Sequence, residues 1–208
     1  MPSTLQRKIA ILKNAAVAGK VHAFEEFESN VPYMYLDVAG QVTVGIGHAI
    51  LSEEAACQLP FKSADGTPAS REVIVAAFKK IHSGRQAQRE KAKPASSFAG
   101  LTDLILAETD IYRLAQQDIA SHEHPLRGKF PDYDRYPAAV QEALLDMIFS
   151  MGLNKLMTGY PRFVAAVRAQ DWATAAAHSG RRQVQGSRNL AIAGKLRSAA
   201  GNGATAAR

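Results

Sequence analysis

The sequence is short of the features that would place it in several common protein classes. It has a single cysteine, Cys57, so a disulfide within the chain and a zinc site built on several cysteines are both excluded. No apolar run approaches the roughly 20 residues that a membrane-spanning helix needs. The apolar run at residues 9–12 ends at Lys13 and is too short for the core of a signal peptide. We therefore expect a chain made in the cytoplasm that leaves it only with outside help.

Acidic residues are absent from the C-terminal end. The chain carries 25 Lys and Arg against 19 Asp and Glu, a net charge of +6, and no acid follows Asp171. The excess comes from six late residues, which are Arg181, Arg182, Arg188, Lys195, Arg197 and Arg208. A basic end favours an anionic partner, such as nucleic acid, a membrane surface or the bacterial cell wall; a solvated tail that only aids solubility is the other interpretation. No aromatic residue follows Trp172, which disfavours stacking on nucleic-acid bases.

Motifs for several catalytic machineries are also missing. There is no Gly-x-Ser-x-Gly nucleophile elbow and no phosphate-binding Walker sequence, and Gly45-Ile-Gly47 lacks the third glycine of a dinucleotide-binding loop. The run His122-Glu123-His124 contains metal-ligating residue types. On a helix, however, residues two apart point to different faces, and we expect Pro125 to end that helix. We therefore expect neither a bound metal nor a cofactor.

Apolar residues recur at helical spacing in most of the chain. The period changes at residues 33–46, where two short runs flank a turn at residues 37–40 and predict a β-hairpin. The expected helices cover residues 5–16, 21–28, 70–81, 102–122 and 137–151, with further helix starts marked by Ser52, Pro161 and Asp171. Residues 83–100 are expected to form a flexible linker or an exposed insertion. The fold class is therefore α+β, mainly α.

Carboxylates gather around the predicted hairpin. Glu25, Glu26 and Glu28 lie at the C-terminal end of the second predicted helix, and Asp37 begins the turn. The negative end of a helix dipole favours a carboxyl group that keeps its proton, while a carboxyl on a solvated turn stays ionised. A proton donor and an ionised carboxylate are the minimum equipment for cleaving a glycosidic bond, and the Thr43 hydroxyl, across the hairpin, could hold a water. The alternative is that these acids are ordinary surface groups.

Two segments together resemble bacteriophage-type lysozymes, glycoside hydrolase family 24. The first runs from Glu28 through Tyr35 and Asp37 to Thr43-Val-Gly-Ile-Gly-His48, and the second is Ala143-Leu-Leu-Asp-Met-Ile-Phe-Ser-Met-Gly152. Three further segments resemble the family: Leu114-Ala-Gln-Gln-Asp118-Ile, Trp172 with the alanine-rich stretch that follows it, and Ser187-Arg188-Asn189. The likeness covers roughly residues 21–48 and 104–195. Residues 1–20 and 49–100 resemble additions to the family pattern.

The resemblance implies a two-lobed fold with a catalytic hairpin in the N-terminal lobe and a helical C-terminal lobe. The expected parts are an N-terminal helical extension, an N-lobe with an insertion, an inter-lobe helix and a C-lobe with a basic tail, at residues 1–20, 21–100, 101–124 and 125–208. The implied activity is that of a muramidase, which hydrolyses the β-1,4 bond between N-acetylmuramic acid and N-acetylglucosamine, with inversion favoured over retention. A chitin-directed glycosidase and a non-catalytic wall- or nucleic-acid-binding module are the alternatives.

The resemblance also assigns roles to residues. Glu28 becomes the general acid, with Glu26 as its rival, Asp37 activates the attacking water, and Thr43 helps to fix that water. Three further assignments concern substrate and support: Phe149 lines the sugar cleft or packs in the core, Arg188 orients the acid, and His48 pairs with Asp118. The expected partner is peptidoglycan, and the expected oligomeric state is a monomer. The chain would reach the wall either as a phage lysin released through a holin or as an effector with a secretion carrier and an immunity protein. The enzyme would act in the periplasm or on the wall.

Overall fold

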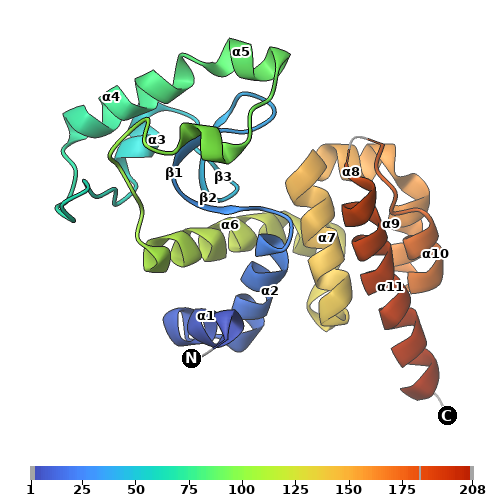
Figure 1. The fold of residues 1–208 in the computed structure, drawn as a ribbon. Helices are drawn as coiled ribbons and strands as arrows, with labels where there is room; N and C mark the ends of the chain where they lie inside the picture. Colours follow the sequence, from blue (N-terminus) through green and yellow to red (C-terminus); the bar gives the residue numbers. More distant parts are fainter. Residues whose placement is uncertain (1–2, 183, 207–208) are drawn as a thin grey trace. The chain divides into compact units, whose positions relative to one another are not determined.

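The computed structural model describes residues 3–182 and 184–206 and is mainly helical with one small antiparallel sheet (Figure 1). This confirms the expected α+β, mainly α class. The chain divides into two compact units, Met1–Asp118 and Ile119–Arg208, called unit 1 and unit 2 below. No helix within the described residues is long and apolar enough to cross a membrane.

Unit 1 begins with two short helices, α1 (Thr4–Leu12) and α2 (Ala15–Glu25). Ser3 and Gln6 form a capping box at the start of α1, and the Asn14 side chain accepts from Val17 N–H at the start of α2. The break lies at Lys13, whose φ of 53° is left-handed. The prediction of one helix over residues 5–16 and another over residues 21–28 was therefore wrong, because the Asn14 cap, and not Gly19, separates them.

The sheet follows in the order β1 (Asn30–Leu36), β2 (Val42–Ile46) and β3 (His48–Ala49). The predicted hairpin is confirmed, with Tyr35 paired to Thr43 in the ladder. The two-residue strand β3 was not predicted, since two residues carry no alternating pattern. The hairpin turn needs Gly40, whose φ is 73° and where an added Cβ would lie 2.7 Å from the Arg85 carbonyl oxygen.

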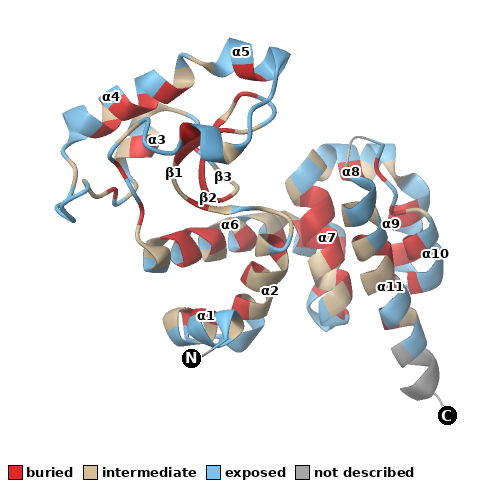
Figure 2. Ribbon diagram, viewed as in Figure 1, coloured by how far each residue is buried: buried red, intermediate tan, exposed pale blue. Residues whose placement is uncertain are grey.

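Helices α3 (Glu53–Cys57) and α4 (Arg71–His82) start directly after Ser52 and Ser70, the two positions that the sequence predicted. The Ser52 hydroxyl accepts from Ala55 N–H, and the Ser70 hydroxyl accepts from Val73 N–H. The inner face of α4 carries its buried residues, Ile74, Ala77, Phe78 and Ile81. Figure 2 shows this face as a stripe along α4.

Residues 83–100 are ordered by contacts, which corrects the linker prediction. They form α5 (Arg85–Glu90) and a 3-10 turn, η1 (Ala95–Phe98). Gln88 is 3% exposed, and its amide donates to the carbonyl oxygens of Leu36 at 3.1 Å and Lys93 at 2.9 Å. A buried, fully used amide fixes this polar segment against β1, and composition alone gives no sign of it.

Helix α6 (Glu108–Lys129) was predicted at residues 102–122 and differs at both ends. It starts later because Ile105 pairs with Lys62 and Leu106 N–H donates to the Pro32 carbonyl oxygen at 2.7 Å. It continues through Pro125 at the cost of one backbone hydrogen bond. The expectation that Pro125 ends the helix was therefore wrong. The division between the two units falls within α6, between residues 118 and 119.

Unit 2 is helical. After a 3-10 turn, η2 (Tyr133–Arg135), come α7 (Ala138–Met151), α8 (Leu153–Gly159), α9 (Pro161–Arg168), α10 (Trp172–Ala177) and α11 (Gly186–Ala206). Asp171 caps α10 through Thr174 N–H at 2.9 Å, as predicted. Helix α7 packs against α11 and buries every residue from Ala143 to Ile148 (Figure 2). It is therefore the central helix of this unit.

Candidate active site

Glu28 lies in the short loop between α2 and β1. Its backbone N–H donates to the Phe24 carbonyl oxygen at 2.9 Å, which continues the last turn of α2 by one bond. The residue is half-buried, whereas Glu26 is exposed. Of the two rival acids, Glu28 is therefore the one that the surrounding residues shield from water.

Asp37 starts the hairpin turn, and its two carboxylate oxygens have different environments. Oδ1 accepts from the N–H groups of Ala39 at 2.9 Å and Gln41 at 2.7 Å, which holds the turn. Within the described residues, no hydrogen bond or ion pair uses Oδ2. The turn therefore fixes the carboxylate while one oxygen remains available to a water.

Helix α5 braces this turn from the insertion. The Arg89 guanidinium donates through Nε to the Ala39 carbonyl oxygen at 2.9 Å, one residue before Gly40. Gln88 holds the Leu36 carbonyl oxygen directly before Asp37. The segment expected to form a flexible linker or an exposed insertion therefore contacts the backbone on both sides of Asp37.

Thr43 is buried on β2, across the hairpin from β1. Its direct partner in the ladder is Tyr35, so Thr43 lies diagonally from Asp37 on the same face of the hairpin and not directly opposite. Its hydroxyl donates to the Gln41 carbonyl oxygen at 3.0 Å. The lone pairs of that hydroxyl can still accept a hydrogen bond from a water.

Tyr35 is the residue of this site to which the sequence assigned no role. Its ring is 9% exposed, and burial raises the pKa of its phenol well above the usual range. The negative charges of Glu28 and Asp37 raise this pKa further. The phenol therefore stays neutral and can donate a hydrogen bond. The alternation along β1, with Tyr35 two residues before Asp37, is the sequence signal that could have indicated it.

His48 and Asp118 meet within unit 1. Nδ1 of His48 lies 3.0 Å from each carboxylate oxygen of Asp118. Both side chains are 23% exposed. The pair joins β3 to α6 and thereby fixes the end of the sheet whose hairpin carries Thr43.

Phe149 and Arg188 lie in unit 2. Phe149 is half-buried on α7, and its ring centroid lies 5.6 Å from that of His122 on α6. Glu123, the residue after His122, is buried, and its carboxylate accepts a hydrogen bond from the Tyr133 hydroxyl at 3.1 Å. His122 and Glu123 therefore take part in packing, whereas His124 is exposed. Among the described residues no group of three His, Cys, Asp or Glu is placed to hold a metal ion.

Arg188 binds Asp146, an acid on α7 that the sequence did not single out. Nε and Nη2 of Arg188 lie 2.8 and 2.7 Å from Oδ1 of Asp146, and Nη1 of Arg181 lies 2.6 Å from Oδ2. Asp146 and Arg181 are 5% and 4% exposed. One buried carboxylate thus holds two guanidinium groups, so Arg188 is fixed through Asp146.

The basic end is less available than its composition indicated. Besides Arg181 and Arg188, Lys195 pairs with Glu142 at 2.6 Å. Arg182 and Arg197 are exposed. Arg208 lies outside the described residues. Among the described residues of the basic end, the exposed cations are therefore Arg182, which precedes α11, and Arg197 on α11, while the other three are paired with carboxylates.

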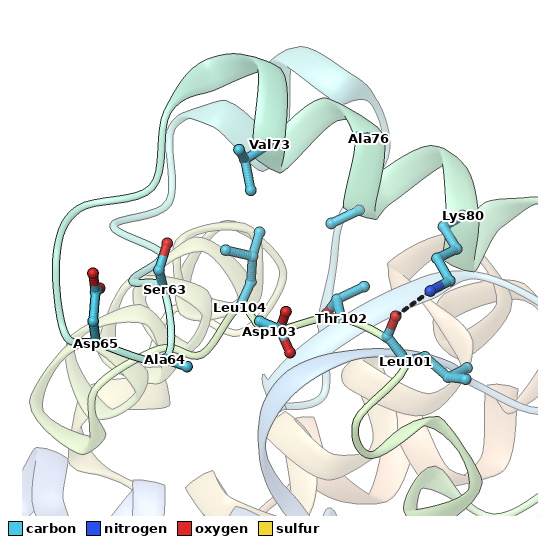
Figure 3. A pocket seen from close by; sticks show the side chains of 11 residues that line it. Ser63, Ala64, Asp65, Val73, Ala76, Lys80, Leu101, Thr102, Asp103 and Leu104 are labelled. Atoms are coloured by element: carbon cyan, nitrogen blue, oxygen red, sulfur yellow. Dashed lines mark hydrogen bonds between the residues drawn. The ribbon is translucent and has the colours of Figure 1, made fainter.

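Unit 1 also has a pocket of about 540 Å³ away from the hairpin (Figure 3). Val73 and Ala76 of α4 face Leu104 across it, and Lys80 donates through Nζ to the Leu101 carbonyl oxygen at 2.6 Å. None of the predicted site residues lines this pocket.

Comparison with known proteins adds no family. No protein-family model matches the chain, and no curated protein matches it in sequence. Any functional conclusion therefore depends on the chain's own residues.

Proposed function

We propose that the chain is a peptidoglycan muramidase with a phage-lysozyme-like fold. The observation that carries the proposal is the pairing of a half-buried acid, Glu28, with an acid that a hairpin turn holds through Oδ1, Asp37. One shielded carboxyl group and one on a turn are the two groups that glycoside hydrolysis uses. The helical character and the single hairpin agree with the proposed fold.

In the proposed reaction Glu28 is the general acid. Its proton goes to the glycosidic oxygen as the bond from that oxygen to the anomeric carbon breaks, so the sugar leaves as a neutral alcohol. Asp37 takes a proton from a water through Oδ2 while the water oxygen bonds to the anomeric carbon. The Thr43 hydroxyl accepts a hydrogen bond from the other O–H of that water, and this hydrogen stays on the new sugar hydroxyl. Attack from the opposite face inverts the configuration, as the resemblance to phage lysozymes favours.

Phe149 and Arg188 complete the proposal from the resemblance. Phe149 would contact a sugar ring through its exposed side, and Arg188, held by Asp146, would orient the acid. The nucleic-acid alternative is weakened because Arg181, Arg188 and Lys195 are already paired with carboxylates. Peptidoglycan is the proposed partner. Release through a holin and secretion with a carrier and an immunity protein both remain compatible with it.

The test is turbidity loss of purified peptidoglycan, followed by mass analysis of reduced fragments. Reducing ends at muramic acid support the proposal, whereas equal hydrolysis of chitin supports the chitin-directed alternative. Glu28→Gln keeps the shape but removes the proton donor, and we expect activity to fall by about 10²–10⁴-fold with an unchanged melting temperature. The matched control is Glu26→Gln, at the exposed rival position. Loss of activity in the control, with Glu28→Gln still active, would overturn the assignment.

A further inference from the structure

The N-terminal helix α1 contains a lysine that is fully enclosed. Lys8 has 0% exposure and forms an ion pair with Oε2 of Glu25. Its Nζ also lies 4.9 Å from the centre of the Tyr112 ring on α6. Burying an ammonium group is costly unless a charge or a ring compensates it. An apolar residue would pack α1 with less cost, so this lysine indicates a more specific task.

The partner of Lys8 sits at one end of the loop that carries Glu28. Glu25 is the last residue of α2, and Asn30 is the first residue of β1. The other oxygen of the Glu25 carboxylate, Oε1, accepts from Nδ2 of Asn30 at 3.0 Å. The Glu25 carboxylate therefore links the two ends of the loop, and Lys8 forms an ion pair with the same carboxylate.

The surroundings keep this arrangement in place. Burial raises the pKa of Tyr112 above the usual range, and the charge of Glu25 and the bond to Glu108 raise it further, so the phenol stays neutral. Its hydroxyl donates to Oε1 of Glu108 at 3.0 Å, while Arg7 pairs with Oε2 at 2.5 Å. Lys8 thus contacts Tyr112 of α6 on one side and the last residue of α2 on the other, whereas the Arg7 pair lies at the exposed edge of α1.

We propose that Lys8 is a positioning residue, which through Glu25 and Asn30 holds the Glu28 loop in the geometry used for proton donation. The proposal gives a task to the helix that the family resemblance leaves as an addition. It rests on the proposed function only for the role of Glu28. The order of the loop itself can be measured without any substrate.

The main variant is Lys8→Met combined with Glu25→Met. Replacing a buried ion pair by apolar residues of similar size is often neutral for stability, so the double variant should keep its melting temperature while the tie to Asn30 is lost. We expect amide hydrogen exchange in residues 26–30 to be faster by about tenfold, the factor that one ordinary hydrogen bond gives. We expect kcat on peptidoglycan to fall roughly 10- to 100-fold with little change in KM, as for other misplaced catalytic groups.

Two further variants complete the experiment. Arg7→Met removes a cation from the same helix, but its pair with Glu108 is exposed by 54% and 39%, so exchange and kcat should stay as in the wild type. Asn30→Ala leaves the buried pair in place and cuts only the bond to the far end of the loop. It should give the same faster exchange in residues 26–30.

The outcomes separate the two proposals. Wild-type exchange at residues 26–30 in Asn30→Ala, or in a folded double variant, overturns the positioning role of Lys8, and so does wild-type kcat in the folded double variant. If the wild type itself does not cleave peptidoglycan, the muramidase proposal fails, while faster exchange in the variants still supports the loop tie.

Discussion

Nδ1 of His48 lies 3.0 Å from both carboxylate oxygens of Asp118, although 70 residues separate them in the sequence. Asp118 holds the end of β3 against α6 through this contact. Because both side chains are 23% exposed, the pair is shielded enough to contribute to stability and still reaches solvent. It connects the sheet to the helix that continues into unit 2.

We expect this pair to show a measurable coupling. Urea unfolding of His48→Asn, Asp118→Asn and the double variant forms a double-mutant cycle, and residues in direct contact give a coupling of about 0.5–3 kcal/mol. The four proteins of the cycle are compared in one buffer at one pH. Strict additivity of the two single effects would contradict a stabilising pair.

The second prediction concerns the carboxylate shared by Arg181 and Arg188. Asp146→Asn leaves the guanidinium of Arg181, which is 4% exposed, without its counter-charge. Removing one partner of a buried ion pair costs about 3–5 kcal/mol, so the free energy of unfolding should fall by that amount in denaturant titration. The control is Glu142→Gln, which breaks the more exposed pair with Lys195 and should cost about 1 kcal/mol or less. Equal losses in the two variants would contradict the buried network.

Local signals in the sequence were sufficient for much of the fold. Each predicted helix cap accepts a hydrogen bond from the backbone three positions ahead, as at Ser52, Ser70 and Asp171. The start of such a helix can therefore be predicted from a few adjacent residues. The hairpin is equally local, since its turn needs only the short stretch from Asp37 to Gly40. Such contacts do not depend on the rest of the chain.

Contacts between distant residues explain what the sequence did not indicate. Gln88 is an ordinary polar residue in a polar run, and only its bond to Leu36, 52 residues away, makes it a buried anchor. Asp146 stands in an apolar helix with no nearby cation, and its arginines come 35 and 42 positions later. Part of the candidate site has the same origin, because the bond from Arg89 to the Ala39 carbonyl oxygen at the Asp37 turn joins residues 50 positions apart.

The third prediction is a loss of stability at alkaline pH. Burial is the main cause that raises the pKa of Tyr35, Tyr112 and Tyr133 above that of a free phenol, near 10. A raised folded-state pKa gives stability that is complete below the unfolded pKa and is lost as pH rises through the folded value. The free energy of unfolding should therefore fall above about pH 10.

Absorbance at 295 nm and circular dichroism test this together. Ionisation of the three buried phenols should coincide with unfolding, and Tyr35→Phe should lessen the dependence of unfolding on pH in that range. If the three phenols ionised near pH 10 in a chain that keeps its ellipticity, their predicted shielding would be wrong.

The last prediction concerns adsorption to the anionic wall, for which composition pointed to the whole basic end. Lys195 is paired with Glu142, whereas Arg182 and Arg197 are exposed. Replacing both arginines by Gln should weaken binding to whole walls at low salt, and the difference from the wild type should shrink as salt rises, because the Debye length falls from about 30 Å at 0.01 M to about 8 Å at 0.15 M. Cosedimentation with purified walls measures this.

Lys195→Gln is the matched control, since the Lys195 cation is already neutralised by a carboxylate, and this variant should adsorb like the wild type. Turnover of a short soluble oligosaccharide should be unchanged in all variants, because exposed cations on unit 2 serve adsorption and not bond cleavage. A stronger loss of adsorption in the Lys195 variant than in the double arginine variant would show that Glu142 does not neutralise that lysine in solution.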